Sequence, residues 1–250
     1  MQKIAFLLLT LSILLGCENP REEKDKILFI VSNQHTYGNT NLNTANHFSE
    51  IVLAYDVFKK RGYKVDFVSP KGGAIPIGYI KTSDSIQKKY LYDTDFMNLL
   101  KTTLKPEVIN PEDYKAVYYV GGGAAMFGVP ENKTIQAITM SIYNNNGIVS
   151  AVCHGTAGIV NLKTDDGNYL VNGKKVNGFP DKFEKKSADY YKTFPFSIEQ
   201  AINTNGGFFT SSEKGWDGFY QVDERLITGQ DPSASASVSR EVIKALKSKL

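Results

Sequence analysis

The sequence predicts a single α/β domain in which a mainly parallel sheet lies between helices. From residue 27 onward, short apolar runs alternate with helical patterns, as in parallel sheets whose strands are joined by helices. The first of these runs is unbroken, which is typical of a strand buried on both faces. We find no internal repeat and no second domain boundary in the 250 residues, a length that suits one well-buried core.

In the first half of the domain, each predicted strand is an apolar run, and each predicted helix has apolar residues three or four positions apart. Gly62 closes the first helix, and Ser69 with Pro70 stops the second strand. In chain order we expect a strand at 27–31, a helix at 47–61, a strand at 64–68, a less regular segment at 71–110 with a helix near 93–103, and a strand at 116–120.

The second half begins with a helix and a strand that ends at Cys153. Asn172-Gly173 is a favourable pair for a two-residue turn, so we expect the flanking segments to form a hairpin. In chain order we expect a helix at 131–145, a strand at 147–152, a helix at 155–162, a hairpin of 169–171 with 175–177, a helix at 196–203, strands at 218–222 and 225–228, and a closing helix at 233–247.

The N-terminal residues predict export and lipid attachment. Lys3 precedes an uncharged run, residues 4–15, that has the length of a signal-peptide core and is too short to span a bilayer. The run ends in Leu14-Leu15-Gly16-Cys17, the pattern of a bacterial lipoprotein signal. Cleavage there would leave Cys17 as the first residue, with lipid on its sulfur and amine. An ordinary secretory signal with an incidental cysteine is the alternative.

This reading divides the chain into three parts and predicts its location. We expect a signal peptide at 1–16, a lipidated flexible tether at 17–26, and the domain at 27–250. Several acyl chains together anchor a protein stably, so we expect a cell-envelope protein held to a membrane outside the cytoplasm. The small net charge of +3, with scattered basic residues, argues against nucleic acid as a partner.

Cys153 is the predicted reactive centre. The chain has two cysteines, and if Cys17 is lipidated, Cys153 has no intramolecular disulfide partner. Cys153 stands where a strand ends and small residues open a helix, the arrangement of a nucleophile elbow. A helix N-terminus lowers the pKa of a thiol, so this position favours a thiolate. A buried, inert cysteine in a tight turn is the alternative reading.

Few other residues near this elbow are candidates for a catalytic or substrate-binding role. His154 follows Cys153 directly, although neighbouring side chains on a turn can point apart. Gly122 and Gly123 follow a predicted strand and would let backbone N–H groups approach an oxyanion, although a glycine run can also be a simple turn. No metal-ligand spacing or phosphate loop occurs in the sequence, so we expect neither a metal nor a cofactor.

Four motifs together resemble the ThiJ/PfpI superfamily, in the branch that holds glutathione-independent glyoxalase III enzymes and related stress chaperones. The resemblance extends from about residue 27 to 246 and implies a flavodoxin-like parallel sheet, as in class I glutamine amidotransferases. The motifs are residues 69–73 (SPKGG), 113–117 (DYKAV) followed by Gly121 and Gly122, 151–155 (AVCHG), and 226–235 (LITGQDPSAS).

The resemblance also implies roles for two carboxyl groups. Glu50 corresponds to a glutamate that hydrogen-bonds the sulfur of the nucleophile, and it would be protonated when it donates to a thiolate. Glu184 has the spacing, after Gly178 and Phe179, of the acidic residue that orients the histidine, and Asp181 is a nearby alternative.

Several positions depart from the family pattern, among them Ala45 and Ala124, which stand where the family has glycine. His47 stands where a tryptophan is common, Gly123 where a histidine usually follows the glycine turn, and Gly128 where an aspartate is expected. Since several of these positions border the family's pocket, the resemblance specifies the nucleophile better than the substrate.

The expected function is a cofactor-free lyase that converts small 2-oxoaldehydes, such as methylglyoxal, into 2-hydroxy acids without glutathione. In this scheme Cys153 attacks the aldehyde and His154 moves the proton. Two alternatives use the same thiolate: a peptidase or amidase, and a stress chaperone or redox sensor. A glutamine amidotransferase is disfavoured because its histidine lies downstream of the elbow, and no histidine follows His154. Family members are often homodimers, so a homodimer is the expected assembly.

Overall fold

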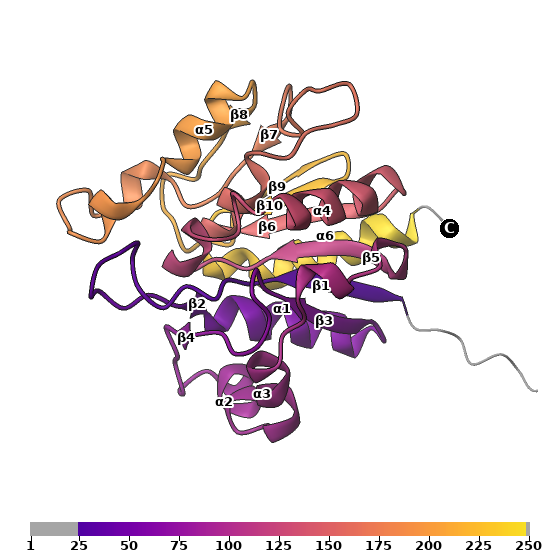
Figure 1. The fold of residues 1–250 in the computed structure, drawn as a ribbon, viewed down its shortest axis with the longest axis vertical. Coiled ribbons are helices and arrows are strands. Elements are labelled where there is room, and N and C mark those ends of the chain that lie inside the picture. Colours follow the sequence, from indigo (N-terminus) through magenta and orange to yellow (C-terminus); the bar gives the residue numbers. More distant parts are fainter. Residues whose placement is uncertain (1–24, 249–250) are drawn as a thin grey trace, which may run out of the picture.

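A twisted sheet of six strands forms the centre of the computed structural model, which describes residues 25–248 (Figure 1). Five strands are parallel, and the strand at one edge, β9, is antiparallel to its neighbour. This arrangement confirms the predicted α/β class. Across the sheet, the strands are β3 (Lys64–Val68), β1 (Lys26–Ile30), β5 (Tyr114–Tyr119), β6 (Ile148–Val152), β10 (Leu226–Gly229) and β9 (Tyr220–Asp223).

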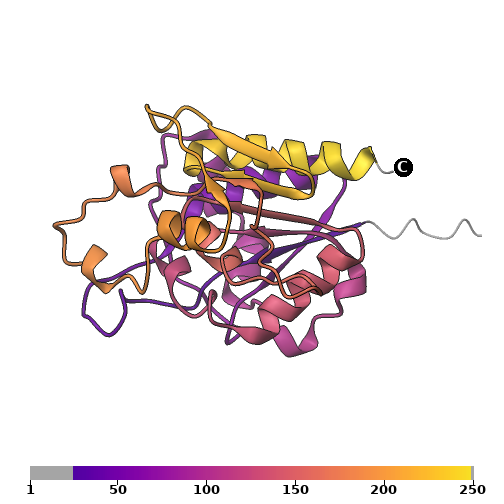
Figure 2. The same cartoon turned by 90° about the horizontal axis from the view of Figure 1, so that it is seen from above.

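Helices cover both faces of this sheet, with α6 (yellow) on one side and α4 (magenta to pink) on the other (Figure 2). Alternate residues of β1 belong to different cores: Leu28 packs with the α4 face, and Phe29 with the α1 face. This explains why the strand has an unbroken apolar run. One face carries α1 (Phe48–Lys60), α6 (Ser235–Lys247), α2 (Ser85–Leu91) and α3 (Thr94–Lys101), and the other carries α4 (Lys133–Asn144) and α5 (Ile198–Thr204).

Three neighbouring strands end at the same edge of the sheet and place their following residues together. β5 leads into Gly121, β6 into Cys153, and β10 into Gln230. Because the three strands are parallel, these carboxyl ends meet, as they do in open α/β folds that bind ligands at this edge.

The predicted hairpin around Asn172-Gly173 is wrong. A turn does occur there, but β7 (Lys175–Val176) pairs in parallel with β8 (Phe208–Phe209). Tyr169 instead forms an isolated antiparallel bridge with Lys163. Tertiary contacts outweigh the turn signal: Val176 is fully buried in the α4-side core, and the N–H of Asn177 donates to Thr228 Oγ1 over 2.9 Å.

Other differences are smaller. The helix predicted at 155–162 is a 3-10 helix that begins at the nucleophile (Cys153–Ile159). The helix α2, whose first N–H groups donate to the side chain of Asp84, falls in the segment that we predicted to be irregular. A short pair of strands, β2 (Asn46–His47) and β4 (Ile77–Gly78), precedes α1 and was not predicted.

The predicted signal peptide, Cys17 and nearly all of the tether lie outside the described residues. We assigned Lys26 to the tether, but it is the first residue of β1. Its Nζ lies 3.5 Å from Oδ2 of Asp66. Within residues 25–248, no helix is both long and apolar enough to span a bilayer.

Candidate active site

The predicted elbow places Cys153 at the end of β6 with a φ of 59°, in the left-handed region that non-glycine residues rarely adopt. The turn presents a side chain that is only 3% exposed. Close packing behind the turn depends on Gly155, because a Cβ at this position would overlap the backbone carbonyl of Tyr119. Backbone strain of this kind is concentrated at functional sites.

Glu50 lies in the first turn of α1 and is completely buried. Its Oε2 accepts a hydrogen bond of 2.7 Å from the N–H of Gly121. Within the described part of the chain, Oε1 is a buried atom without a hydrogen-bond partner, and the carboxyl interacts with the Cys153 thiol. Burial raises the pKa of Glu50 to about 8, although the Gly121 N–H and Cys153 oppose the shift. Glu50 is therefore protonated at neutral pH, with its proton available to the sulfur.

The structure corrects the expected pKa of Cys153. Burial first, and the Glu50 carboxyl second, raise the pKa of Cys153 well above its ordinary value, while the backbone N–H of His154 acts in the opposite direction. The α-helix N-terminus expected to lower it is instead a short 3-10 helix. The sulfur therefore rests as a thiol and becomes a nucleophile only when a neighbouring base takes its proton.

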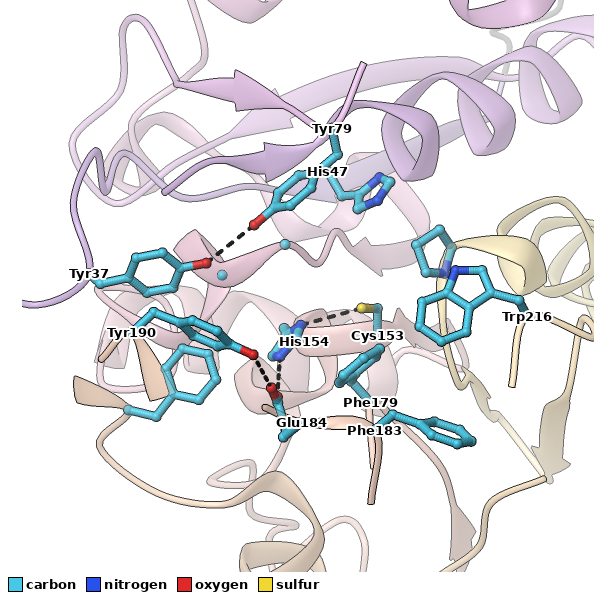
Figure 3. A pocket seen from close by; sticks show the side chains of 14 residues that line it. Tyr37, His47, Tyr79, Cys153, His154, Phe179, Phe183, Glu184, Tyr190 and Trp216 are labelled. Atoms are coloured by element: carbon cyan, nitrogen blue, oxygen red, sulfur yellow. Dashed lines mark hydrogen bonds and ion pairs between the residues drawn. The ribbon is translucent and has the colours of Figure 1, made fainter. Parts of the chain in front are cut away.

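His154 is placed to be that base. Its Nδ1 lies 3.4 Å from Cys153 Sγ, and its Nε2 lies 2.7 Å from Glu184 Oε1 (Figure 3). A proton on Nε2 that is donated to Glu184 leaves the lone pair of Nδ1 facing the sulfur. The other oxygen of Glu184 accepts a hydrogen bond of 3.1 Å from the Tyr190 hydroxyl.

The structure decides between the two carboxylates considered for this position. Glu184 contacts the histidine, whereas Asp181 forms an ion pair of 3.1 Å with Lys186 and accepts a hydrogen bond of 2.8 Å from Ser197. The His154 ring also lies between two aromatic rings: Phe179 stacks on it at 4.8 Å, and Phe194 meets it edge-on at 5.5 Å. These contacts fix the plane of the imidazole.

A cavity of about 340 Å³ opens in front of the sulfur. Gly122 lines it with a φ of 93°, and a Cβ at Gly122 would overlap the Ala45 carbonyl, so only glycine fits. In the described chain the N–H of Gly122 has no partner, whereas that of Gly123 interacts with the Tyr79 hydroxyl. The lining residues are Tyr37, His47, Tyr79, Gly122, Gly123, Cys153, His154, Phe179, Phe183, Glu184, Tyr190, Phe194, Trp216 and Pro232.

His47, which departs from the family pattern, also borders this cavity. Its ring stacks on Tyr79 at 4.7 Å, and its Nδ1 lies 2.9 Å from Ser49 Oγ. Burial first, and the nearby His154 second, lower the pKa of His47 to about 4. His47 is therefore a neutral, polar part of the wall at physiological pH.

The sequence reasoning missed the aromatic character of the cavity. Phe179 was used only as a spacing marker, and Tyr79, Tyr190 and Trp216 were not considered. One usable signal was Trp216, the single tryptophan of the chain, which stands between Gly215 and Gly218 in a polar loop. Within residues 25–248, no group of three or more His, Cys, Asp or Glu side chains is placed to hold a metal ion.

Comparisons with known proteins show which family the chain resembles over most of its length. Residues 44–245 match the DJ-1/PfpI family. A glutathione-independent glyoxalase of Schizosaccharomyces pombe is 31% identical over 82% of this chain and 90% of its own length. Glyoxalase 3 of Candida albicans is 29% identical over 88% of this chain and 98% of its own length.

Two solved structures superpose on most of the chain. The crystal structure of glyoxalase III from Candida albicans superposes with a TM-score of 0.80 at 26% identity, covering 88% of this chain and 97% of that one. The Rapid Encystment Protein of 24 kDa from Francisella tularensis superposes with a TM-score of 0.82 at 28% identity, covering 89% of this chain and 99% of that one.

Proposed function

The chain belongs to the DJ-1/PfpI family, and we propose that it is a cysteine-dependent lyase that converts small 2-oxoaldehydes into 2-hydroxy acids without glutathione. The observation that carries this proposal is the contiguous arrangement of Cys153, His154 and Glu184 at the base of a cavity, with a protonated Glu50 beside the sulfur. These groups supply a nucleophile, a base with a fixed tautomer, and an acid.

The reaction begins with methylglyoxal in the cavity. His154 Nδ1 takes the proton of Cys153, and the thiolate attacks the aldehyde carbon to form a hemithioacetal. The developing oxyanion points toward the free N–H of Gly122, which polarises it as an oxyanion-hole donor does. Glu50 stabilises the thiolate by donating its proton toward the sulfur before the C–S bond forms.

The second stage moves hydrogen from one carbon to the other. The hemithioacetal oxyanion first takes the proton that His154 received from Cys153, which frees Nδ1. His154 then removes the proton from the hemithioacetal carbon, giving an enediol, and delivers it to the former ketone carbon, while the hydroxyl proton passes to the neighbouring oxygen. The aldehyde carbon is thereby oxidised to a thioester, and the ketone carbon is reduced to an alcohol, so no external oxidant is consumed. Water hydrolyses the thioester, which releases lactate and restores the Cys153 thiol.

The test is formation of lactate from methylglyoxal without glutathione, followed by NMR for the wild type and for Cys153→Ala. We expect the wild type to make lactate and the variant to fall to the rate of buffer. Glu107→Gln, an exposed position that does not line the cavity, is the control and should match the wild type. Equal rates for the wild type and Cys153→Ala would exclude the lyase.

We further propose that Cys17 carries lipid and holds the domain at a membrane outside the cytoplasm. The proposal is supported by the apolar run that ends in Gly16-Cys17 and by the polar stretch after it. An alkyne-labelled fatty acid fed to expressing bacteria should label the wild type and leave Cys17→Ser unlabelled, and only the wild type should sediment with membranes. Labelling of neither protein would contradict the proposal. The expected homodimer stays a prediction, which sedimentation equilibrium checks.

A further inference from the structure

Two large aromatic residues at the rim of the active-site cavity have unfavourable backbone conformations. Tyr79 has a φ of 57° and Trp216 a φ of 48°, and their side chains are 51% and 61% exposed. Bulky residues rarely adopt a positive φ, and such strain persists where the surrounding structure enforces it. Five non-glycine residues in the described chain have a positive φ, and three of them, Tyr79, Cys153 and Trp216, line this one cavity.

Buried groups at the end of β10 hold Trp216 in this position. The N–H of Trp216 donates over 2.7 Å to Oδ2 of Asp231, which is fully buried. On either side of Trp216, the N–H of Ser212 donates to Gln230 Oε1 over 2.7 Å, and the N–H of Gly218 donates to Ser233 Oγ over 2.9 Å. The loop is therefore fixed to the sheet edge that also carries the nucleophile, and the exposed indole has a defined position.

The Trp216 side chain completes an aromatic wall beside the sulfur. Its ring lies 6.0 Å from Phe179 and 6.0 Å from Phe183, and the two phenyl rings lie 6.4 Å apart. In Figure 3, Trp216 and Tyr79 lie on different sides of the cavity, with the Cys153 sulfur at its base. An apolar surface that remains exposed at the rim of a pocket is typical of a ligand-binding site.

The cavity is larger than methylglyoxal requires. Its volume of about 340 Å³ lies in the range of pockets that hold drug-sized ligands, about 300–1,000 Å³. Methylglyoxal has only five non-hydrogen atoms, so it leaves most of this space, and the aromatic wall, without contact. A ring on the substrate would fill that space and gain edge-to-face or stacking contacts with the wall.

We propose that the preferred substrates are 2-oxoaldehydes that carry an aryl or similarly bulky apolar group on the ketone carbon, which the Trp216 wall binds. The proposal rests on the lyase chemistry above and names its substrate class. With phenylglyoxal as the representative, the aldehyde carbon becomes a carboxylate, the ketone carbon becomes a secondary alcohol, and one water is added, giving mandelate. The electrons stay within the molecule.

Kinetics test the preference. We expect the wild type to show a kcat/KM for phenylglyoxal at least tenfold above that for methylglyoxal, and Trp216→Ala to lower this ratio at least tenfold. Tyr92→Ala removes a side chain that is 73% exposed and lies outside the cavity, so it should leave both values unchanged. A wild type that prefers methylglyoxal, or an unchanged ratio in Trp216→Ala, would overturn the proposal.

Binding gives a second readout that does not depend on turnover. Trp216 is the only tryptophan of the chain, so its fluorescence reports on this wall alone. In Cys153→Ala protein, mandelate should perturb the emission with a Kd at least tenfold below that for lactate. Equal affinities would overturn the proposal.

The two readouts separate failure of the substrate class from failure of the lyase. If the wild type and Cys153→Ala act equally on both aldehydes, the lyase is excluded, and the fluorescence result still decides whether the wall binds an aryl group. If the wild type makes lactate but not mandelate, the lyase stands and the substrate class is wrong.

Discussion

At the scale of single residues, the active site depends on two buried acids that lie side by side. Glu50 and Cys153 are both almost inaccessible to water, and burial is the main cause that raises the pKa of each. Because burial raises the pKa of Glu50 to about 8, the carboxyl stays neutral at the pH where the thiol must react. At most one of the two groups is therefore ionised at a time during the reaction.

This arrangement predicts a pH dependence of stability. Glu50 binds a proton in the folded state up to pH about 8, whereas its ordinary pKa is 4.5. Between these values the folded state holds a proton that the unfolded state has lost, so the free energy of unfolding falls as pH rises, by about 1.4 kcal/mol per unit. In Glu50→Gln this contribution is absent, and the variant should become increasingly more stable than the wild type from pH 4.5 to 8.

Urea denaturation at several pH values measures the difference, with Glu107→Gln as the matched control at an exposed site. Glu50→Gln should also abolish lyase activity. Wild-type activity should decline above pH about 8, where Glu50 ionises. A stability difference that stays constant with pH would show that Glu50 is not protonated in the folded protein.

Glu184 should affect the rate rather than the fold. Its carboxylate holds His154 in the tautomer that faces the sulfur, so Glu184→Gln should lower kcat at least tenfold. Asp181→Asn removes a nearby carboxylate that does not contact the histidine, and its kcat should stay within threefold of the wild type. Similar losses in both variants would argue against an orienting role for Glu184.

The sequence predicted the central residues of this site better than its wall. Cys153, His154, Glu50 and Glu184 have motif neighbours or fixed spacings, and the structure brings all four together. The aromatic wall comes from separate loops with no shared pattern, so only the folded chain shows that these rings meet. The pKa of Cys153 was predicted in the wrong direction because burial cannot be read from a local motif.

At the scale of elements, the elbow between β6 and its 3-10 helix is the part that most restricts the sequence. Gly155 lies against the backbone of β5, and the helix packs there only because no Cβ intervenes. Gly155→Ala should therefore lower the free energy of unfolding by about 1–3 kcal/mol, measured in urea, and reduce activity by displacing Cys153. A change below about 0.5 kcal/mol would show that the 3-10 helix can lie further from β5 without loss of stability.

The elements that the sequence predicted well are those with a long apolar pattern, such as α1, α4, α6 and the central strands. Their patterns are local, and the sheet buries the same residues that the periodicity marks. The failed hairpin at Asn172-Gly173 had a correct turn, but its partner strand, β8, lies over thirty residues further along the chain. Pairing between short distant segments is set by the tertiary core and not by local signals.

At the scale of the whole molecule, the function depends on the order of strands in the sheet. The ends of β5, β6 and β10 lie next to one another, so Gly122, Cys153 and the loop-anchoring Asp231 are brought together from distant parts of the chain. Helix α1 adds Glu50, whose carboxyl accepts a hydrogen bond from the N–H of Gly121 at this same edge. This convergence at one edge is why a single domain can hold the complete lyase chemistry proposed above.

The most direct test of this account is conversion of methylglyoxal in D₂O without glutathione, with NMR analysis of the lactate. The proton that His154 removes is held on an N–H that can exchange with D₂O through the open cavity before the ketone carbon is protonated. The wild type should therefore give lactate with deuterium at C2, and Cys153→Ala should form no lactate. Lactate with only protium at C2, or equal lactate from both proteins, would contradict it.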